Sequence, residues 1–156
     1  MNEIKISSPD QNSIIIKFVE EAIANSKKGN KNLKNDWLNF GDIPQNAIDY
    51  VKNKFKIDLT GYKYVIEASY VLHSLNRHGD ESNDRYPISV FDFCAIPLII
   101  SEFDKIDLGG LKNNNQKTLL FKKTIDNQCY FVSASDIRNK RKSIAFNSIY
   151  KRKTRK

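Results

Sequence analysis

Glycine, proline and cysteine are scarce in this sequence. Its 156 residues include 6 glycines, 4 prolines and 2 cysteines, which excludes collagen-like and low-complexity chains. The two cysteines, Cys94 and Cys129, are too few for a disulfide scaffold and lack the close spacing of a zinc site. We therefore expect two buried thiols in a reducing compartment.

Long apolar runs are missing as well. The longest cover residues 14–16 and 96–100, far short of the roughly 20 residues that span a bilayer. The first 13 residues lack the basic start and apolar middle of a signal peptide. We expect a chain of one domain that neither crosses a membrane nor is exported by its own leader.

The motifs of several large enzyme classes are also absent. There is no glycine-rich phosphate loop, no GxSxG elbow and no HExxH pair. The acidic residues Asp80, Glu81 and Asp84 lack the glycine and terminal glutamate of a calcium loop. We interpret them as a solvated turn between two helices rather than as a cation site or a pair for glycoside chemistry.

Acidic residues are in the minority, and one end of the chain has none. The whole sequence has 26 Lys and Arg against 18 Asp and Glu, a net charge of +8. Residues 138–156 hold nine basic residues and no acid, which leaves 17 basic against 18 acidic residues in the first 137. Such a local excess of positive charge is typical of chains that bind nucleic acid.

Apolar residues recur at helical spacing through the first two thirds of the chain. The spacing predicts a helix between Ser13 and Gly29 and then a polar, mobile loop over residues 30–36. A second helix of about three turns follows the capping residue Asp42. A third helix is predicted over residues 65–77, and Gly79 provides its stop signal.

A fourth helix is predicted to start at Ser89. Its hydroxyl and the carboxylate of Asp92 have the spacing of a capping box. Pro97 is expected to kink or split this helix before Phe103.

Beyond the glycine pair at 109–110 the apolar period changes to that of strands. Runs over residues 117–124, 128–135 and 142–151 predict an antiparallel meander. Simple alternation in the last run places four side chains on one face: Ile144, Phe146, Ser148 and Tyr150. Helices first and strands later predict an α+β fold, with N-terminal helices packed on a C-terminal antiparallel β-sheet.

The two histidines, His73 and His78, are the residues best suited to proton transfer near neutral pH. They are five apart, so on one helix their directions differ by about 140°. If the helix ends at Gly79, His78 can turn away from the helix axis. The alternative for each is a histidine packed at the edge of the core. A zinc site made from both histidines, Cys94 and Cys129 is a further alternative, although their spacing fits no compact finger.

Cations, hydroxyls and aromatic side chains alternate along the predicted sheet. An aromatic platform flanked by cations is a common way to hold single-stranded nucleic acid, although a polar, solvent-facing sheet surface would look similar. The residues that we expect to contact RNA are Arg77, Tyr130, Ser133, Arg138, Lys142, Lys151 and Lys153.

Several segments, taken in order, resemble one nuclease superfamily. They are His-x4-His-Gly, the helix start Ser-Val-Phe-Asp-Phe with Pro-Leu-Ile-Ile behind it, Lys122-Lys123, Tyr-Phe-Val-Ser and Ser-Ile-Tyr-Lys. Over residues 42–153 the chain is similar to the prophage branch of the barnase/EndoU/colicin/RelE-like (BECR) nucleases, which includes toxin domains of contact-dependent inhibition systems. The resemblance implies a BECR domain over residues 42–156, with residues 1–41 adding a helix and a mobile loop to one compact unit.

The resemblance also implies an activity and a set of site residues. The activity is metal-independent cleavage of RNA, often transfer RNA, without a cofactor. The residues carried over are His73, His78, Lys122 or Lys123, Ser148 where many relatives have threonine, and Tyr150 two residues further on. We expect His73 to act as general base, His78 or Tyr150 as acid, and the lysines, Arg77 and Ser148 to hold the phosphate.

Partners and location follow from the same resemblance. A toxin of this kind acts in the cytoplasm of the producing or a target bacterial cell, can be delivered within a larger secreted protein, and requires an acidic immunity protein in the producing cell. A phage protein without an inhibitor is the other option. The alternative in a different class is a non-catalytic RNA- or DNA-binding module with a basic C-terminal tail.

Overall fold

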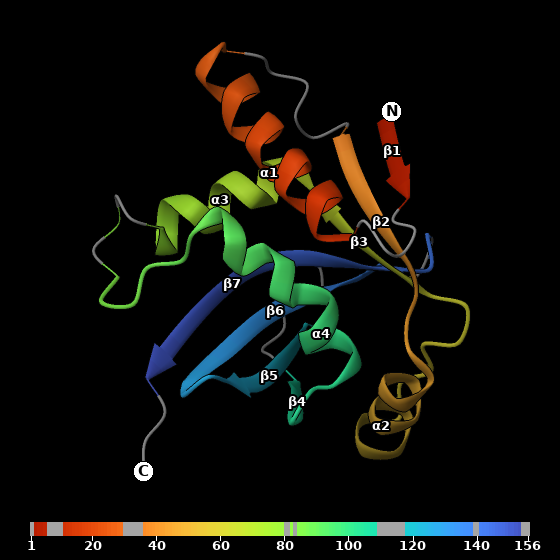
Figure 1. The fold of residues 1–156 in the computed structure, drawn as a ribbon. Helices are drawn as coiled ribbons and strands as arrows, with labels where there is room; N and C mark the ends of the chain where they lie inside the picture. Colours follow the sequence, from red (N-terminus) through yellow and green to blue (C-terminus); the bar gives the residue numbers. More distant parts are fainter. Residues whose placement is uncertain are drawn as a thin grey trace.

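The computed structural model describes residues 2–5, 11–29, 36–79, 82, 84–108, 118–138 and 141–153. These residues form a seven-stranded mixed sheet with helices against it (Figure 1). The strands are β1 (Asn2–Lys5), β2 (Asp36–Asp42), β3 (Lys63–Glu67), β4 (Lys105–Leu108), β5 (Leu119–Ile125), β6 (Gln128–Arg138) and β7 (Ser143–Lys153). The helices are α1 (Gln11–Lys27), α2 (Gln45–Phe55), α3 (Ala68–His78), the 3-10 helix η2 (Val90–Ala95) and α4 (Ile96–Ser101).

The order of strands in the sheet is β1-β2-β3-β7-β6-β5-β4. The four strands from β7 to β4 pair antiparallel, whereas β3 pairs with β7 in parallel. The predicted α+β fold and the three predicted strands of the meander are confirmed as β5, β6 and β7. The sequence patterns missed β1, β2, β3 and β4, so the sheet draws on more of the chain than predicted. Residues 30–35 of the predicted loop lie outside the described residues, and residue 36 already belongs to β2.

The predicted third helix is in fact a strand followed by a helix. The chain runs as β3 through Glu67 and becomes helical at Ala68. Tyr64, Val65 and Ile66 are all buried, and a short continuous apolar run fits a buried strand as well as a helix. The helix ends before Gly79, as predicted. A Cβ at Gly79 would lie 2.5 Å from the Leu75 carbonyl oxygen, so the close approach of the backbone requires glycine.

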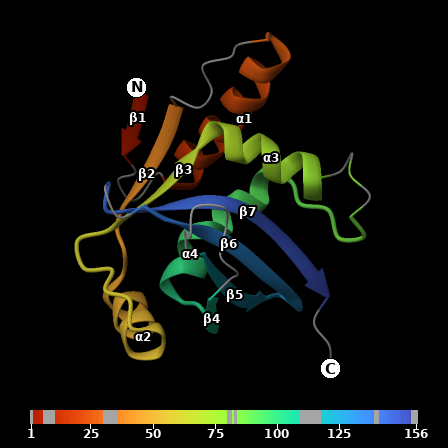
Figure 2. The same ribbon diagram turned by 180° about the vertical axis from the view of Figure 1, so that it is seen from behind.

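Helix α3 takes the place of a strand beside β7. The pairing of β3 with β7 stops at Val65 and Ala145, and α3 then runs along β7 (Figures 1 and 2). The fully buried Ser74 hydroxyl accepts a hydrogen bond from the Ile149 N–H (2.9 Å) and donates one to the Ile149 carbonyl (3.1 Å). One side chain therefore satisfies both backbone groups that β3 no longer reaches, and it fixes α3 against β7.

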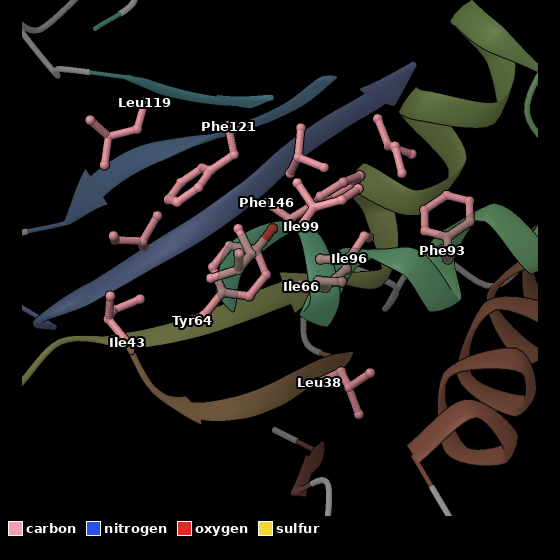
Figure 3. Packing of buried hydrophobic residues seen from close by; sticks show 14 of the residues in the cluster. Leu38, Ile43, Tyr64, Ile66, Phe93, Ile96, Ile99, Leu119, Phe121 and Phe146 are labelled. Carbon is pink, nitrogen blue, oxygen red and sulfur yellow. The ribbon is translucent and has the colours of Figure 1, made fainter. Parts of the chain in front are cut away.

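The predicted capping box and split at Pro97 are both confirmed. The Asp92 carboxylate accepts a hydrogen bond from the Ser89 N–H (2.7 Å) at the start of η2, and α4 follows with proline in its first turn. Helix α4 covers one face of β5 and β6. Figure 3 shows its side chains Ile96 and Ile99 packed toward Phe121 and Phe146 of the sheet. No helix among the described residues has the length and apolar character needed to cross a membrane.

A β-bulge corrects the predicted faces of β7. Ser133 pairs with Ser148, but the next residue of β6 pairs with Phe146, so Asn147 is an additional residue in β7. Phe146 consequently packs against Phe93, with ring centroids 5.9 Å apart, on the same side as the buried Ile149. Ile144 and Phe146 thus point into the core, while Ser148 and Tyr150 point to the other side. The prediction that all four share a face was wrong because a bulge reverses the alternation.

We call the side of β5–β7 opposite α4 the far face. The pairing of Lys122 with Phe131, and of Phe131 with Tyr150, places Lys122 and Tyr150 on this face, since paired residues of an antiparallel sheet share a side. Arg152 follows two residues after Tyr150. The far face therefore presents basic and phenolic groups at the end of β7.

Candidate functional site

Polar groups from α3, the loop behind it and β7 meet at one end of the sheet. Figures 1 and 2 both show the end of α3 beside the C-terminal half of β7. Helix α3 contributes His78, the loop contributes Asp84, and β7 contributes Tyr150 and Arg152. The loop is closed at its base, because the Ile88 N–H donates to the His78 carbonyl (2.7 Å) and Gly79 bridges to Ile88.

His78 is oriented by a nearly buried carboxylate. Its Nδ1 lies 2.9 Å from Oδ2 of Asp84, whose side chain is only 5% exposed. The other carboxylate oxygen of Asp84 accepts a hydrogen bond from the Tyr86 N–H (2.9 Å). A carboxylate at Nδ1 favours the tautomer with its proton there, which leaves Nε2 to accept a proton. This is the arrangement that a histidine general base requires.

Arg152 completes the cluster around Asp84. Its guanidinium lies 3.1 and 3.2 Å from the two carboxylate oxygens and also donates to the Lys151 carbonyl (2.7 Å). Burial acts to raise the pKa of Asp84, but hydrogen bonds from the Tyr86 N–H and His78, together with the charge of Arg152, outweigh it. The pKa of Asp84 therefore lies below its ordinary value, and the carboxylate stays charged beside His78.

Tyr150 lies between His78 and Arg152. Its ring centroid is 5.1 Å from that of His78 and 5.1 Å from the guanidinium carbon of Arg152. Burial raises the pKa of Tyr150, although the charges of Arg152 and Lys122 partly oppose the shift. The phenol thus keeps its proton at neutral pH and is a hydrogen-bond donor or acid beside the imidazole.

Of the two lysines in β5, Lys122 shares the far face with Tyr150. Its ammonium lies 2.7 Å from Asp107, and this hydrogen bond raises the pKa of Lys122, so the charge is permanent at neutral pH. Lys123 alternates to the α4 side and lies 3.8 Å from Asp104. Ser148 is on the far face two residues before Tyr150, with 8% of its surface exposed.

A pocket of about 510 Å³ adjoins this cluster. Its lining consists of Arg77, His78, Asp84, Arg85, Tyr86 and Arg152. This lining includes three arginines and one carboxylate, a composition that suits a phosphate ligand because arginine can bind two phosphate oxygens at once. Tyr86 adds an aromatic side chain to the lining, the kind of group on which nucleic-acid bases commonly stack.

The remaining predicted residues lie elsewhere. His73 is half-buried on α3 with its ring 6.1 Å from that of Tyr70, and it does not line the pocket. Tyr130 and Lys151 are on the α4 side, where both contact Asp92 at 2.7 and 3.3 Å. Burial, with the hydrogen bond to Asp92, raises the pKa of Tyr130. Lys142 and Lys153 are exposed at the two ends of β7, and the side chains of Ser133 and Arg138 lie outside the described residues.

The cysteines and histidines are not gathered around one point. Cys94 lies against the Asn12 carbonyl (3.8 Å), whereas Cys129 is in β6, and both thiols are half-buried rather than buried as expected. Burial raises the pKa of each thiol. In the part of the chain that the structure describes, no three His, Cys, Asp or Glu side chains are placed to hold a metal ion.

The sequence patterns missed four residues of the site: Asp84, Arg85, Tyr86 and Arg152. The interpretation of Asp84 as part of a solvated turn was wrong, because the folded loop returns it to His78 and buries it. The one signal in the sequence was the position of a carboxylate six residues after a histidine at a helix end. Arg152 appeared in the sequence only as one charge among many in the basic C-terminal stretch.

Comparison with known proteins identifies the family. No curated protein and no solved structure matches the chain. One family model matches residues 43–156, which contain α2, α3, the site loop and β3–β7. Helix α1, β1 and β2 precede the matched region, although β2 pairs with β3 in the same sheet. The chain therefore belongs to the family of phage-Barnase-EndoU-ColicinE5/D-RelE like nuclease 3, and it is a nuclease of the BECR type.

Proposed function

We propose that this nuclease is a metal-independent endoribonuclease that cuts single-stranded RNA loops, with transfer RNA as the expected natural target. The observation that carries the proposal is the grouping of His78, Asp84, Tyr150 and Arg152 at the end of β7, on the face that also holds Lys122. The group contains a base, an acid and cations, and it adjoins the pocket that His78, Asp84 and Arg152 help to line. Such a group can cleave RNA by activating the 2′-hydroxyl of the RNA itself as the nucleophile.

The reaction begins at His78. Its Nε2 takes the proton of the 2′-hydroxyl, and the oxyanion forms a bond to the adjacent phosphorus. The bond from phosphorus to the 5′-oxygen breaks, and this oxygen takes the proton of the Tyr150 phenol. The products are a 2′,3′-cyclic phosphate and a 5′-hydroxyl, and the proton on His78 passes to Tyr150 through water to restore both groups. Each proton transfer contributes roughly 10²- to 10⁴-fold to the rate.

Cations stabilise the charge that develops on the phosphate oxygens. The positive charges of Arg152 and Lys122 each act to lower the pKa of Tyr150, which means that both side chains lie near its phenol. Both are therefore placed to interact with the phosphate at which the RNA is cut. Arg77 and Arg85 line the adjoining pocket and are placed to bind the next phosphate of the chain. Removal of one well-placed donor to a transition-state oxyanion costs about 10²- to 10³-fold in such enzymes.

His78 replaces His73 as the proposed base. A base must have its lone pair directed at the substrate, and the contact of Asp84 with Nδ1 provides this for His78. From the sequence we expected His73 to be the base and His78 or Tyr150 the acid. We now propose a catalytic role for His78 but not for His73, whose ring lies near that of Tyr70 and outside the pocket.

The test is cleavage of a purified RNA oligonucleotide in excess EDTA, followed by analysis of the product ends. We expect fragments with 2′,3′-cyclic phosphate and 5′-hydroxyl ends. A matched substrate with one 2′-deoxyribose at the main cleavage position should resist cutting at that position only. Cleavage at the deoxy position, or products with 5′-phosphate ends, would contradict the proposal, because either result requires water rather than the 2′-hydroxyl as nucleophile.

A further inference from the structure

The edge strand β4 adds two charged side chains to the far face beside Lys122. Lys105 of β4 pairs directly with Lys122 of β5, and paired residues of an antiparallel sheet share a side. Asp107 follows Lys105 by two residues and is therefore on the same side. Two lysines opposite each other repel, and Asp107 offsets this repulsion. Its Oδ1 lies 3.4 Å from the Lys105 ammonium, and its Oδ2 lies 2.7 Å from that of Lys122.

The contact between Asp107 and Lys122 is the closer of the two and the better shielded from water. These side chains are 29% and 28% exposed, whereas that of Lys105 is 53% exposed. The hydrogen bond from Lys122 is the largest cause of the lowered pKa of Asp107, ahead of the hydrogen bond from Lys105. The carboxylate is thus ionised at neutral pH. Because a lysine side chain has much rotamer freedom in water, this hydrogen bond restricts where the Lys122 ammonium can lie.

Lys122 acts on Tyr150 from the position in which Asp107 holds it. Both Lys122 and Tyr150 pair with Phe131 of β6, one from each side, so they lie in one row across the far face. Burial raises the pKa of Tyr150, and the charges of Arg152 and Lys122 act against this rise, so the ammonium lies near the phenol. Lys122 is therefore bonded to Asp107 of β4 and close to Tyr150 of β7 at once.

We propose that Asp107 is a positioning residue, which holds the Lys122 ammonium where it stabilises the charge that develops on the cleaved phosphate. This inference rests on the proposed function and adds β4 to the elements that build the site. Cations that are fixed before the reaction stabilise a transition state without a cost of reorganisation, whereas a mobile lysine must first be ordered. Asp107 thus acts on the cation as Asp84 acts on the base, His78.

The test is a double-mutant cycle of Asp107→Ala and Lys122→Ala, measured by single-turnover cleavage of one RNA in EDTA at saturating protein. The matched control is Lys105→Ala, because it removes the other partner of Asp107 from the same strand. Circular dichroism verifies that each variant is folded. If Asp107→Ala does not fold, Asp107→Asn takes its place in the cycle, since it keeps the shape of the side chain and removes the charge.

We expect Lys122→Ala to lose about 10²- to 10³-fold in rate and Asp107→Ala to lose on the order of 10-fold. The double variant should cut within about twofold of Lys122→Ala, because no ammonium is left to position. Lys105→Ala should cut within about twofold of wild type. The inference is overturned if Asp107→Ala cuts as fast as wild type, or if the Asp107 substitution slows the Lys122→Ala variant by the same factor as it slows wild type.

A second measurement does not depend on cleavage. In protein with ¹⁵N-labelled lysine, the ammonium protons of Lys122 should exchange with water faster in Asp107→Ala than in wild type, because they lose a hydrogen-bond acceptor. Lys122→Ala assigns the signal, and Lys105→Ala should leave it unchanged. Unchanged exchange in Asp107→Ala would overturn the inference even if the protein cut RNA as proposed. Wild-type products with 5′-phosphate ends would instead overturn the proposed function.

Discussion

At the scale of single residues, Asp84 determines what His78 can do. A histidine at a helix end, taken by itself, rotates and samples both tautomers, and neither its direction nor its proton is fixed. The hydrogen bond from Nδ1 to Asp84 fixes both, and Arg152 and the Tyr86 N–H keep the carboxylate ionised and in place. Asp84 is thus a positioning residue, which acts on the reaction through His78.

Substitution of Asp84 by Asn should reduce kcat by up to about 10⁴-fold, the effect of losing the carboxylate that fixes the tautomer of a catalytic histidine. It should also destabilise the fold by about 1–3 kcal/mol at pH 7, since a nearly buried group loses charged hydrogen bonds. The measurements are steady-state cleavage and urea unfolding. Asp126→Asn, at the exposed β5–β6 turn, removes the same charge and should change neither.

The stability difference between wild type and Asp84→Asn should depend on pH in a defined direction. Because the pKa of Asp84 is lowered in the folded state, its stabilisation is complete above the ordinary carboxylate pKa of about 4 and is lost as the pH falls through the folded-state value. The difference should therefore shrink as the pH falls below about 4. A difference that grows below pH 4 would contradict the lowered pKa of Asp84.

At the scale of elements, Ser74 connects helix α3 to the edge of β7. Its hydroxyl forms hydrogen bonds with both the N–H and the carbonyl of Ile149. Ile149 directly precedes Tyr150 in β7, and Ser74 lies four residues before His78 in α3. The same contact therefore sets the distance between His78 and Tyr150. A shift of α3 relative to β7 would separate the base, His78, from the acid, Tyr150, even if both side chains were present.

Ser74→Ala should destabilise the protein by about 2–4 kcal/mol, because two buried backbone groups lose their partners. Urea unfolding checks this, with Ser69→Ala as the control, a half-buried serine in the same helix that should change stability by less than about 0.5 kcal/mol. Equal effects of the two substitutions would show that Ser74 does not hold α3 on β7.

The bulge at Asn147 sets which side chains of β7 enter the core. Deletion of Asn147 gives strict alternation in which Phe146 directly precedes Ser148, so that Ile144 and Phe146 stay in the core while Ser148 and Tyr150 stay on the far face. We therefore expect the deletion variant, like Asn147→Ala, to retain cooperative unfolding and near-UV circular dichroism. Loss of both in the deletion variant alone would mean that Asn147 is not the additional residue of β7.

The elements that the sequence predicted best are those with local signals. The capping box at Ser89, the split at Pro97 and the strand runs after residue 117 depend on neighbours in the chain, and each is present in the structure. Strand β3 was misread because its apolar run continues into the stripe of α3. The bulge at Asn147 depends on pairing between β6 and β7, so alternation within β7 could not reveal it.

At the scale of the whole molecule, folding brings basic residues from distant parts of the chain to one pocket. Arg77, Arg85 and Arg152 all line the pocket beside His78. Only Arg152 belongs to the basic C-terminal stretch of the sequence, because the order of the chain does not reveal which residues folding brings together. The resemblance predicted the nuclease family and the segments of the site, but the orientation of His78 by Asp84 required the fold.

The most direct test of the account compares His78→Ala and His73→Ala in single-turnover cleavage of one RNA in EDTA. Both substitutions remove an imidazole from α3, so they are matched in chemistry and in helix. The account predicts a loss of about 10²- to 10⁴-fold for His78→Ala and, once folding is verified by circular dichroism, less than 10-fold for His73→Ala. Full activity of His78→Ala together with loss of activity in His73→Ala would contradict it.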